Sequence, residues 1–89
     1  MSYRIEFKRS VKKDIQPLPQ SVLARLREAI EALSLDPHPP GSQMIRGYQD
    51  YFRIRLGTYR VIYQVDDVVR IICIIKIGHR KDVYRKLSH

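Results

Sequence analysis

Three arginines lie close together in the C-terminal half of the chain, at positions 53, 55 and 60. Gly57 and Thr58 between them fit a two-residue hairpin turn, which would pair Arg55 with Arg60 directly across two strands. Like charges in that position destabilise a sheet by a few tenths to about 1 kcal/mol. The arginines could simply be solvated on an open sheet face. Because no acidic residue of these strands neutralises them, we instead predict a preorganised phosphate-binding site.

The segment that follows the last predicted strand carries further groups with useful chemistry. Arg80, Lys81 and Arg85 add positive charge that could contact RNA. His79 has a side chain whose ordinary pKa lies near neutrality, so it is a candidate acid or base, although a single loop histidine is often only exposed. Tyr84 could stack on a nucleobase or pack its ring into the core. We expect this segment to lie over the open face of the sheet.

Other chemistries find little support in the sequence. No pair of carboxylates falls in the predicted site, and no glycine-rich phosphate loop is present. His38, His79 and His89 lack the spacing of metal ligands. We therefore expect neither a metal nor a small-molecule cofactor.

The net charge of +8, from 17 Lys and Arg against 9 Asp and Glu, favours a polyanionic partner such as nucleic acid or an acidic protein. A soluble basic surface without such a partner is the alternative. Residues 1–43 carry 7 basic and 5 acidic side chains, whereas residues 44–89 carry 10 and 4. We expect the anion-binding site in the C-terminal half.

The chain of 89 residues is long enough for a single domain, residues 1–89, with one modest core. A single cysteine, Cys73, can form no internal disulfide, which favours a reducing compartment. The sequence has neither a signal-peptide core at its start nor a run of about 18 apolar residues. A cytoplasmic location without membrane contact is the expectation.

Changes in hydrophobic periodicity predict the elements that must position the arginines. The predicted order is strand 3–7, helix 10–15, helix 19–33, strands 51–56, 59–65 and 68–77, and a short C-terminal helix within residues 79–87. The expected turns are Gly57-Thr58 and Asp66-Asp67, and Gly78 should end the sheet. This is an α+β fold with a mostly antiparallel sheet, β-α-α-β-β-β-α order, and two N-terminal helices packed on one face.

The last predicted strand is apolar on both faces. Simple alternation places Val69, Ile71, Cys73, Ile75 and Ile77 on one face, and Ile72 and Ile74 on the other.

The run from Tyr51-Phe52-Arg53-Ile54-Arg55-Leu56 through Gly57-Thr58-Tyr59-Arg60-Val61-Ile62-Tyr63 to Ile77-Gly78-His79-Arg80 and Asp82-Val83-Tyr84 resembles the RelE branch of the RelE/ParE toxin superfamily. The resemblance covers nearly the whole chain. It implies the toxin of a type II toxin-antitoxin system, a metal-independent ribonuclease that cleaves messenger RNA in the ribosomal A site through a ribose 2′-OH. It also implies two kinds of partner, namely the ribosome with its mRNA and a cognate RelB-like antitoxin.

By position, the resemblance implies that Arg53 and Arg60 stabilise the phosphate, that Arg80 is the acid that assists the leaving oxygen, and that Tyr84 stacks on or orients the substrate. Arg55 falls where the RelE pattern often has a lysine proposed as general base. A guanidinium, with a pKa above about 12, releases a proton far less readily than a lysine ammonium. The base could therefore be Arg55, His79 or no single residue, with electrostatic stabilisation carrying the rate.

Two other functions are consistent with the sequence. The ParE branch shares the fold but inhibits DNA gyrase by binding, so the fold alone does not separate the two activities. The sheet arginines, with Arg80 and Tyr84, favour the nuclease. The other alternative is an inactive domain that retains only antitoxin or ribosome binding.

Overall fold

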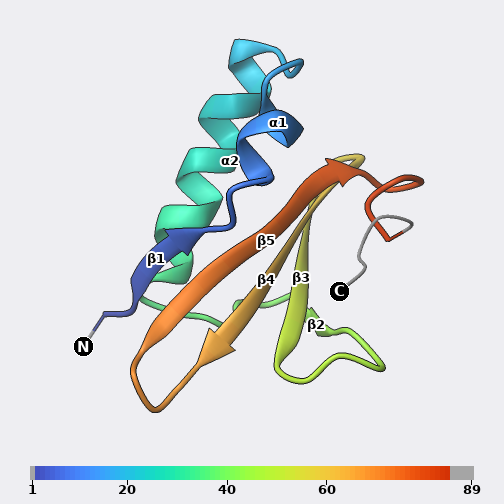
Figure 1. Ribbon diagram of the computed structural model, residues 1–89. Coiled ribbons are helices and arrows are strands. Elements are labelled where there is room, and N and C mark those ends of the chain that lie inside the picture. The colour runs from blue at the N-terminus through green and yellow to red at the C-terminus, as the bar shows by residue number, and fades with distance from the viewer. Residues whose placement is uncertain (1, 85–89) are drawn as a thin grey trace.

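The computed structural model describes residues 2–84, which form one five-stranded sheet with two helices (Figure 1). The elements are β1 (Arg4–Phe7), α1 (Val11–Ile15), α2 (Gln20–Leu33), β2 (Gln43–Met44), β3 (Tyr51–Leu56), β4 (Tyr59–Asp66) and β5 (Ile71–His79). The strand order across the sheet is β1-β5-β4-β3-β2. Only β1 and β5 run parallel, and the other neighbours are antiparallel.

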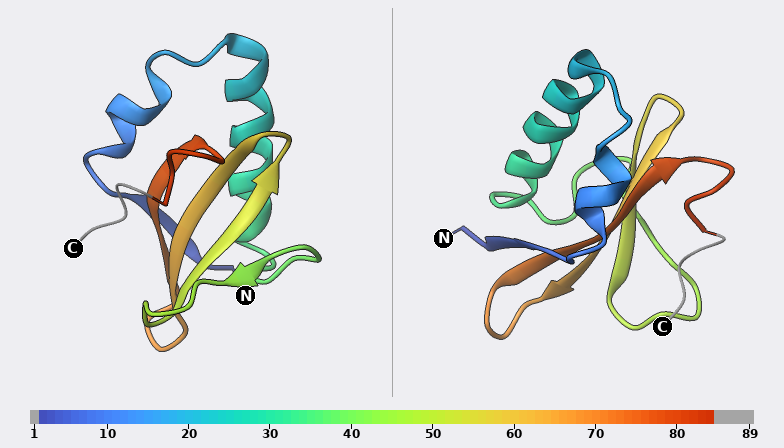
Figure 2. Two further views of the ribbon diagram at one scale, coloured as in Figure 1. Left: turned by 90° about the vertical axis from the view of Figure 1, so that its right-hand side faces the viewer. Right: turned by 45° about the horizontal axis from the view of Figure 1, so that its top comes forward.

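Both helices lie on the same side of the sheet, as the two views of Figure 2 show. Helix α2 follows Pro19, which stands at its N-cap, and its apolar residues recur at helical spacing. Its buried residues Leu26, Ile30 and Leu33 join Val11 of α1 in the main core. The sheet contributes Ile54, Val61, Tyr63, Val65, Ile72, Ile74 and Ile77 to this core.

The hairpin of β3 and β4 has the predicted register. Leu56 pairs with Tyr59 across the turn, and Arg55 therefore pairs with Arg60. Gly57 adopts a φ of 63°, a left-handed conformation that suits glycine in a tight hairpin turn. The prediction that the two arginines face each other is confirmed.

Strand β5 departs from the predicted pattern in three ways. It begins at Ile71 rather than Val68, because residues 67–70 form a longer turn in which Arg70 has a positive φ.

A register shift in β5 lies opposite Ile62 and Tyr63, which pair with Lys76 and Ile74. This bulge moves Ile77 to the helix-covered face with Ile72 and Ile74, so the predicted grouping of Ile77 with Cys73 and Ile75 is wrong. The strand also continues through Gly78 to His79.

The predicted element order is incomplete as well. A short strand, β2, pairs Gln43 with Arg53 and Met44 with Phe52 and extends the sheet beyond β3. Residues 80–84 form turns rather than a helix, with the N–H groups of Asp82 and Val83 both bonded to the His79 carbonyl. The remainder of the predicted C-terminal helix lies outside the described residues.

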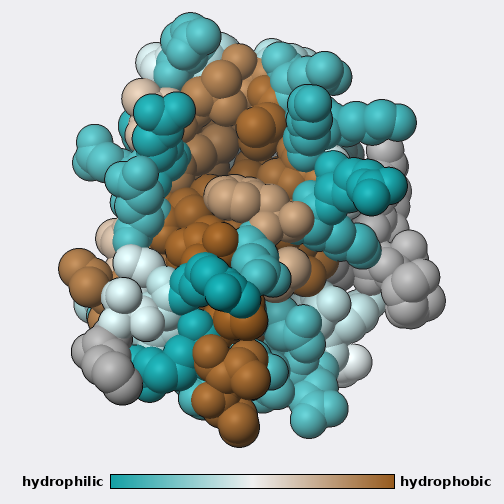
Figure 3. Space-filling model, turned by 60° about the vertical axis from the view of Figure 1, so that its left-hand side comes forward, coloured by the Kyte–Doolittle hydropathy of each residue, from teal (hydrophilic) through white to brown (hydrophobic). Residues whose placement is uncertain are grey.

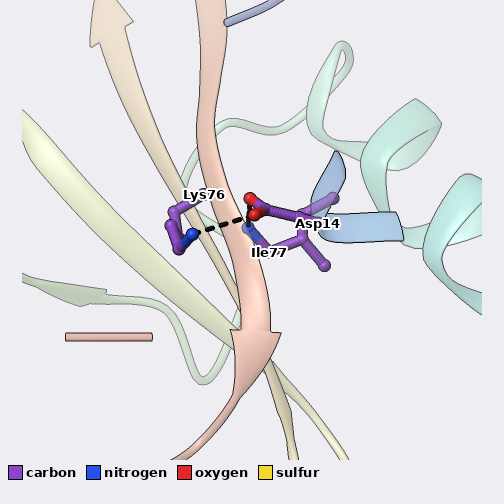
Figure 4. A network of polar contacts seen from close by, with 3 residues as sticks. All are labelled: Asp14, Lys76 and Ile77. Carbon is purple, nitrogen blue, oxygen red and sulfur yellow. Dashed lines mark hydrogen bonds and ion pairs between the residues drawn. The ribbon is translucent and has the colours of Figure 1, made fainter. Parts of the chain in front are cut away.

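A partly buried ion pair attaches α1 to β5 (Figure 4). Lys76 Nζ lies 2.8 Å from Asp14 Oδ1, and the two side chains are only 17% and 10% exposed. Asp14 Oδ2 also accepts the backbone N–H of Ile77 at 3.1 Å. Pairing between β1 and β5 ends at Ile74. The Asp14 carboxylate thus satisfies a strand-edge N–H where β1 no longer reaches.

An apolar groove of about 460 Å³ lies between β1 and the two helices. Its lining includes Ile5, Phe7, Ile15 and Leu23, with Arg27 and Glu31 as its charged residues. Figure 3 shows the groove as a hydrophobic band between hydrophilic side chains. Within residues 2–84, neither helix has the length and apolar character needed to cross a bilayer.

Candidate nucleic-acid interface

The hairpin arginines lie on the sheet face that the helices leave uncovered. Arg53, Arg55 and Arg60 alternate with residues of the main core, so their side chains leave the sheet on the opposite side. A second, smaller cluster of buried Ile62, Ile75 and Val83 occupies this same face. The arginines therefore share this face with a small apolar cluster.

The Arg60 side chain turns back over its own hairpin. Its Nη1 donates to the carbonyls of Gly57 and Tyr59, each at 3.0 Å. These carbonyl dipoles partly offset the repulsion from Arg55, which is exposed on the neighbouring strand. The bonds also restrict the rotamers of Arg60, so this guanidinium is held in place before any ligand arrives.

Arg53 is held by a residue that the sequence analysis did not single out. Its Nη2 donates to Gln43 Oε1 on the neighbouring strand β2. A strand of two residues shows no alternation, so no sequence pattern pointed to Gln43. A pocket of about 280 Å³ adjoins the pair and is lined by Pro40, Gly41, Gln43, Arg53, Ile54 and Arg55.

The C-terminal turn lies on the side of the sheet away from the helices, as Figure 2 shows. The backbone N–H of Arg80 donates to the Thr58 carbonyl at 2.7 Å. Val83 is fully buried against Ile62 and Ile75 and anchors the turn. A Cβ on Gly78 would lie 3.7 Å from the Val83 side chain, so the two chain segments pack closely. No sequence pattern identified Val83 as this anchor, because the turn has no regular period.

The other predicted residues of this turn have varied positions. The Arg80 and Lys81 side chains are exposed, and Tyr84 is 43% exposed. The ring of Tyr84 is therefore accessible for stacking rather than packed into the core. Arg85, a predicted RNA contact, lies outside the described residues.

Strand alternation directs the His79 side chain to the helix-covered face, and its Nδ1 accepts the backbone N–H of Lys81 at 3.4 Å. His79 pairs with Tyr59, and their rings meet edge to face with centroids 6.2 Å apart. Tyr59 precedes Arg60 in the strand and so points to the opposite face. His79 lines a pocket of about 580 Å³ between helix α1 and the C-terminal turn, with Asp14, Leu18, Asp82 and Val83. The structure thus gathers Arg53, Arg55, Arg60 and Arg80 and leaves His79 on the other side.

The remaining nucleophile, Cys73, is poorly suited to react. Burial, with a smaller contribution from the Glu6 carboxylate, raises the pKa of its thiol. A raised pKa lowers the fraction of reactive thiolate at neutral pH. Across residues 2–84, no three His, Cys, Asp or Glu side chains are grouped so that they could hold a metal ion. Among the described residues, the arginine face offers guanidinium cations and the rings of Tyr48, Tyr51 and Tyr84.

Comparison with known proteins gives consistent similarities. Residues 5–84 match the family model described as the ParE toxin of the type II toxin-antitoxin system, parDE. The chain is 34% identical over 87 residues to Toxin RelG of Mycobacterium tuberculosis, which covers 97% of this chain and 100% of that protein. It is 37% identical over 90 residues to the putative toxin RelE1 of Methanocaldococcus jannaschii, with coverage of 96% and 98%.

Solved structures agree with these sequence matches. The archaeal RelE-RelB complex from Pyrococcus horikoshii aligns with a TM-score of 0.80 at 34% identity, covering 90% of this chain and 97% of the matched chain. The RelBE2 toxin-antitoxin complex from Mycobacterium tuberculosis aligns with a TM-score of 0.77 at 29% identity, covering 90% and 100%. The similarity extends over the hairpin and the C-terminal turn, because the family match reaches residue 84.

Proposed function

Because this chain belongs to the ParE toxin family of type II toxin-antitoxin systems and is a RelE-type toxin, we propose that it is an endoribonuclease that cuts messenger RNA in the ribosomal A site. The observation that carries this proposal is the bond between the Arg80 N–H and the Thr58 carbonyl. It joins the C-terminal turn to the hairpin, so that Arg80 stands beside the face with Arg53, Arg55 and Arg60. Such a group of fixed cations suits a substrate whose charge increases during reaction.

The proposed reaction is an attack of a ribose 2′-OH on the adjacent phosphate. A bond forms between the 2′ oxygen and phosphorus, and the bond from phosphorus to the 5′ oxygen of the next nucleotide breaks. The products are a 2′,3′-cyclic phosphate and, once the leaving oxygen takes a proton from water, a 5′-OH end. Arg53 and Arg60 stabilise the negative charge of the phosphorane, and Arg80 stabilises the leaving 5′ oxygen. Tyr84 stacks on a base and orients the ribose.

Deprotonation of the 2′-OH requires no dedicated base in this proposal. His79 lies on the helix-covered face with Tyr59, away from the arginines. A guanidinium makes a poor general base. We therefore assign most of the rate to electrostatic stabilisation and to alignment of the 2′ oxygen, with the proton leaving to solvent.

The proposed partners follow from the charge and from the relatives. A net charge of +8 favours docking on ribosomal RNA, where counterion release contributes most of the affinity. The two solved relatives are complexes of a toxin with its antitoxin. We infer a cytoplasmic RelB-like antitoxin here, with an acidic segment that covers the arginine face and binds less tightly as salt rises.

Primer extension on a translated message tests this function. Purified toxin should produce cuts at a fixed position within codons, and these cuts should disappear when initiation is blocked. DNA gyrase assayed in parallel should supercoil normally. Inhibited gyrase together with intact message would instead identify a ParE-like activity. Intact message with normal gyrase would identify a domain that retains binding alone.

A further inference from the structure

We propose that Gln43 is a positioning residue that aims the guanidinium of Arg53 at the substrate phosphate. The inference rests on the proposed ribonuclease function and extends it to a residue outside the arginine group. Gln43 lies directly across from Arg53 in the pairing of β2 with β3. Its side-chain oxygen accepts a hydrogen bond from Arg53 Nη2.

The position of Gln43 is itself fixed by the core. The loop before β2 is anchored where the buried Tyr63 hydroxyl donates to the Pro37 carbonyl at 2.7 Å. The His38 ring lies edge to face against Phe52 of β3, with centroids 4.6 Å apart. The Ser42 N–H donates to the Pro39 carbonyl at 3.0 Å and closes the turn that leads into β2. Gln43 therefore projects from a rigid support.

A long arginine side chain populates many rotamers unless a partner selects one, and ordering it costs conformational entropy. Gln43 binds one terminal nitrogen of Arg53, Nη2. Among the described residues, Arg53 Nη1 is buried and has no hydrogen-bond partner. Arg53 also lines the adjoining pocket with Gly41 and Arg55, so a phosphate in this pocket would lie against its guanidinium.

The consequence is specific to the chemical step. The overall positive charge still attracts RNA when Gln43 is replaced, so the half-saturating ribosome concentration should change little. The cation that meets the phosphorane is no longer held at its position. Misplacement of a catalytic group by about 1 Å costs on the order of a hundredfold in rate, so we expect the cleavage rate to fall roughly tenfold to a hundredfold.

A double-mutant cycle in single-turnover cleavage on programmed ribosomes tests the inference. Gln43→Met keeps the length of the side chain but removes the acceptor. If Gln43 acts through Arg53, this substitution lowers the rate in the parent and has almost no effect in an Arg53→Ala background. Met44→Thr on the same strand is the matched control and should cleave at the parental rate. Equal effects of Gln43→Met in both backgrounds would overturn the inference.

A second readout does not depend on cleavage. In ¹⁵N NMR spectra of the free protein, the guanidinium nitrogens of Arg53 should be resolved by hindered rotation in the parent and averaged in Gln43→Met. Averaged signals in the parent would contradict a fixed guanidinium. Active parent enzyme with additive rate effects would reject only the role of Gln43, whereas inactive parent enzyme would reject the proposed function and this role with it.

Discussion

At the scale of single residues, Arg80 is the side chain whose removal should separate chemistry from docking. Its backbone is held by Thr58, so Arg80→Ala should leave the turn in place. We expect ribosome binding to weaken only slightly, because one of many positive charges is lost. Loss of one preorganised charge-stabilising donor typically lowers the rate on the order of a hundredfold to a thousandfold. Single-turnover cleavage and ribosome cosedimentation measure the two quantities.

The matched control for Arg80 is Arg25→Ala, which removes the same charge from an exposed site on helix α2. It should cleave at nearly the parental rate. Equal activity of Arg80→Ala and Arg25→Ala would contradict the role assigned to Arg80.

Because Arg55 and Arg60 face each other, replacing Arg55 should raise or preserve stability and lower the cleavage rate. Arg55→Thr removes one of two like charges that face each other and introduces a residue that favours strands. We expect the free energy of unfolding to stay level or to rise by a few tenths of a kcal/mol. Cleavage should fall, because the phosphate loses a cation. Urea unfolding and single-turnover kinetics measure both, and marked destabilisation would show that Arg55 has a structural role.

At the scale of elements, the Asp14 carboxylate completes the edge of β5 beyond β1. Asp14→Ala leaves Lys76 without its partner and the Ile77 N–H unsatisfied. Removing one member of this partly buried pair leaves polar groups unsatisfied at a cost of about 1 to 3 kcal/mol, which is a large part of the stability of a small domain. Asp14→Asn retains an acceptor for the Ile77 N–H and should lose less.

Chemical denaturation of the two Asp14 variants and of Lys76→Met measures these costs. Replacing both members with Asp14→Leu and Lys76→Met should recover much of the stability lost in Asp14→Ala, since neither charge is then left unpaired. A double variant that is less stable than Asp14→Ala would show that the ion pair itself is strongly stabilising.

The elements also show where sequence reasoning succeeds and where it fails. The arginine hairpin could be predicted because a glycine turn and strict alternation determine its register. The bulge in β5 could not, because every residue from Ile71 to Ile75 is apolar except Cys73, and no polar position marks a face. The bulge places Ile77 in the main core, and the strand's continuation pairs His79 with Tyr59. The unpredicted bulge therefore changes which residues form the core and on which face of the sheet His79 lies.

At the scale of the whole molecule, the buried Tyr63 makes stability depend on pH in alkaline solution. Burial raises the pKa of Tyr63 to about 12 from its ordinary value of 10. The folded state therefore holds the phenol proton more tightly than the unfolded state. The associated stability is fully present below pH 10 and is lost as the pH rises from 10 to 12, by roughly 2 to 3 kcal/mol.

Tyr63→Phe tests this dependence. At neutral pH the variant should be less stable by about 1 kcal/mol, because it lacks the hydrogen bond to the Pro37 carbonyl. Between pH 10 and 12 the difference should shrink or reverse, since the variant has no phenol to ionise. Parallel loss of stability in both proteins would mean that Tyr63 does not ionise in this range.

The proposed function requires the molecule as a whole to bring a message's own 2′-OH into line with its phosphate. The most direct test is a message with a single 2′-deoxy nucleotide at the cleaved position, presented in the A site of programmed ribosomes. We predict that the all-ribose message is cut to a 2′,3′-cyclic phosphate and that the substituted message remains intact, although the toxin binds both ribosome complexes equally. Cleavage of the 2′-deoxy message at the same position and rate would contradict the mechanism.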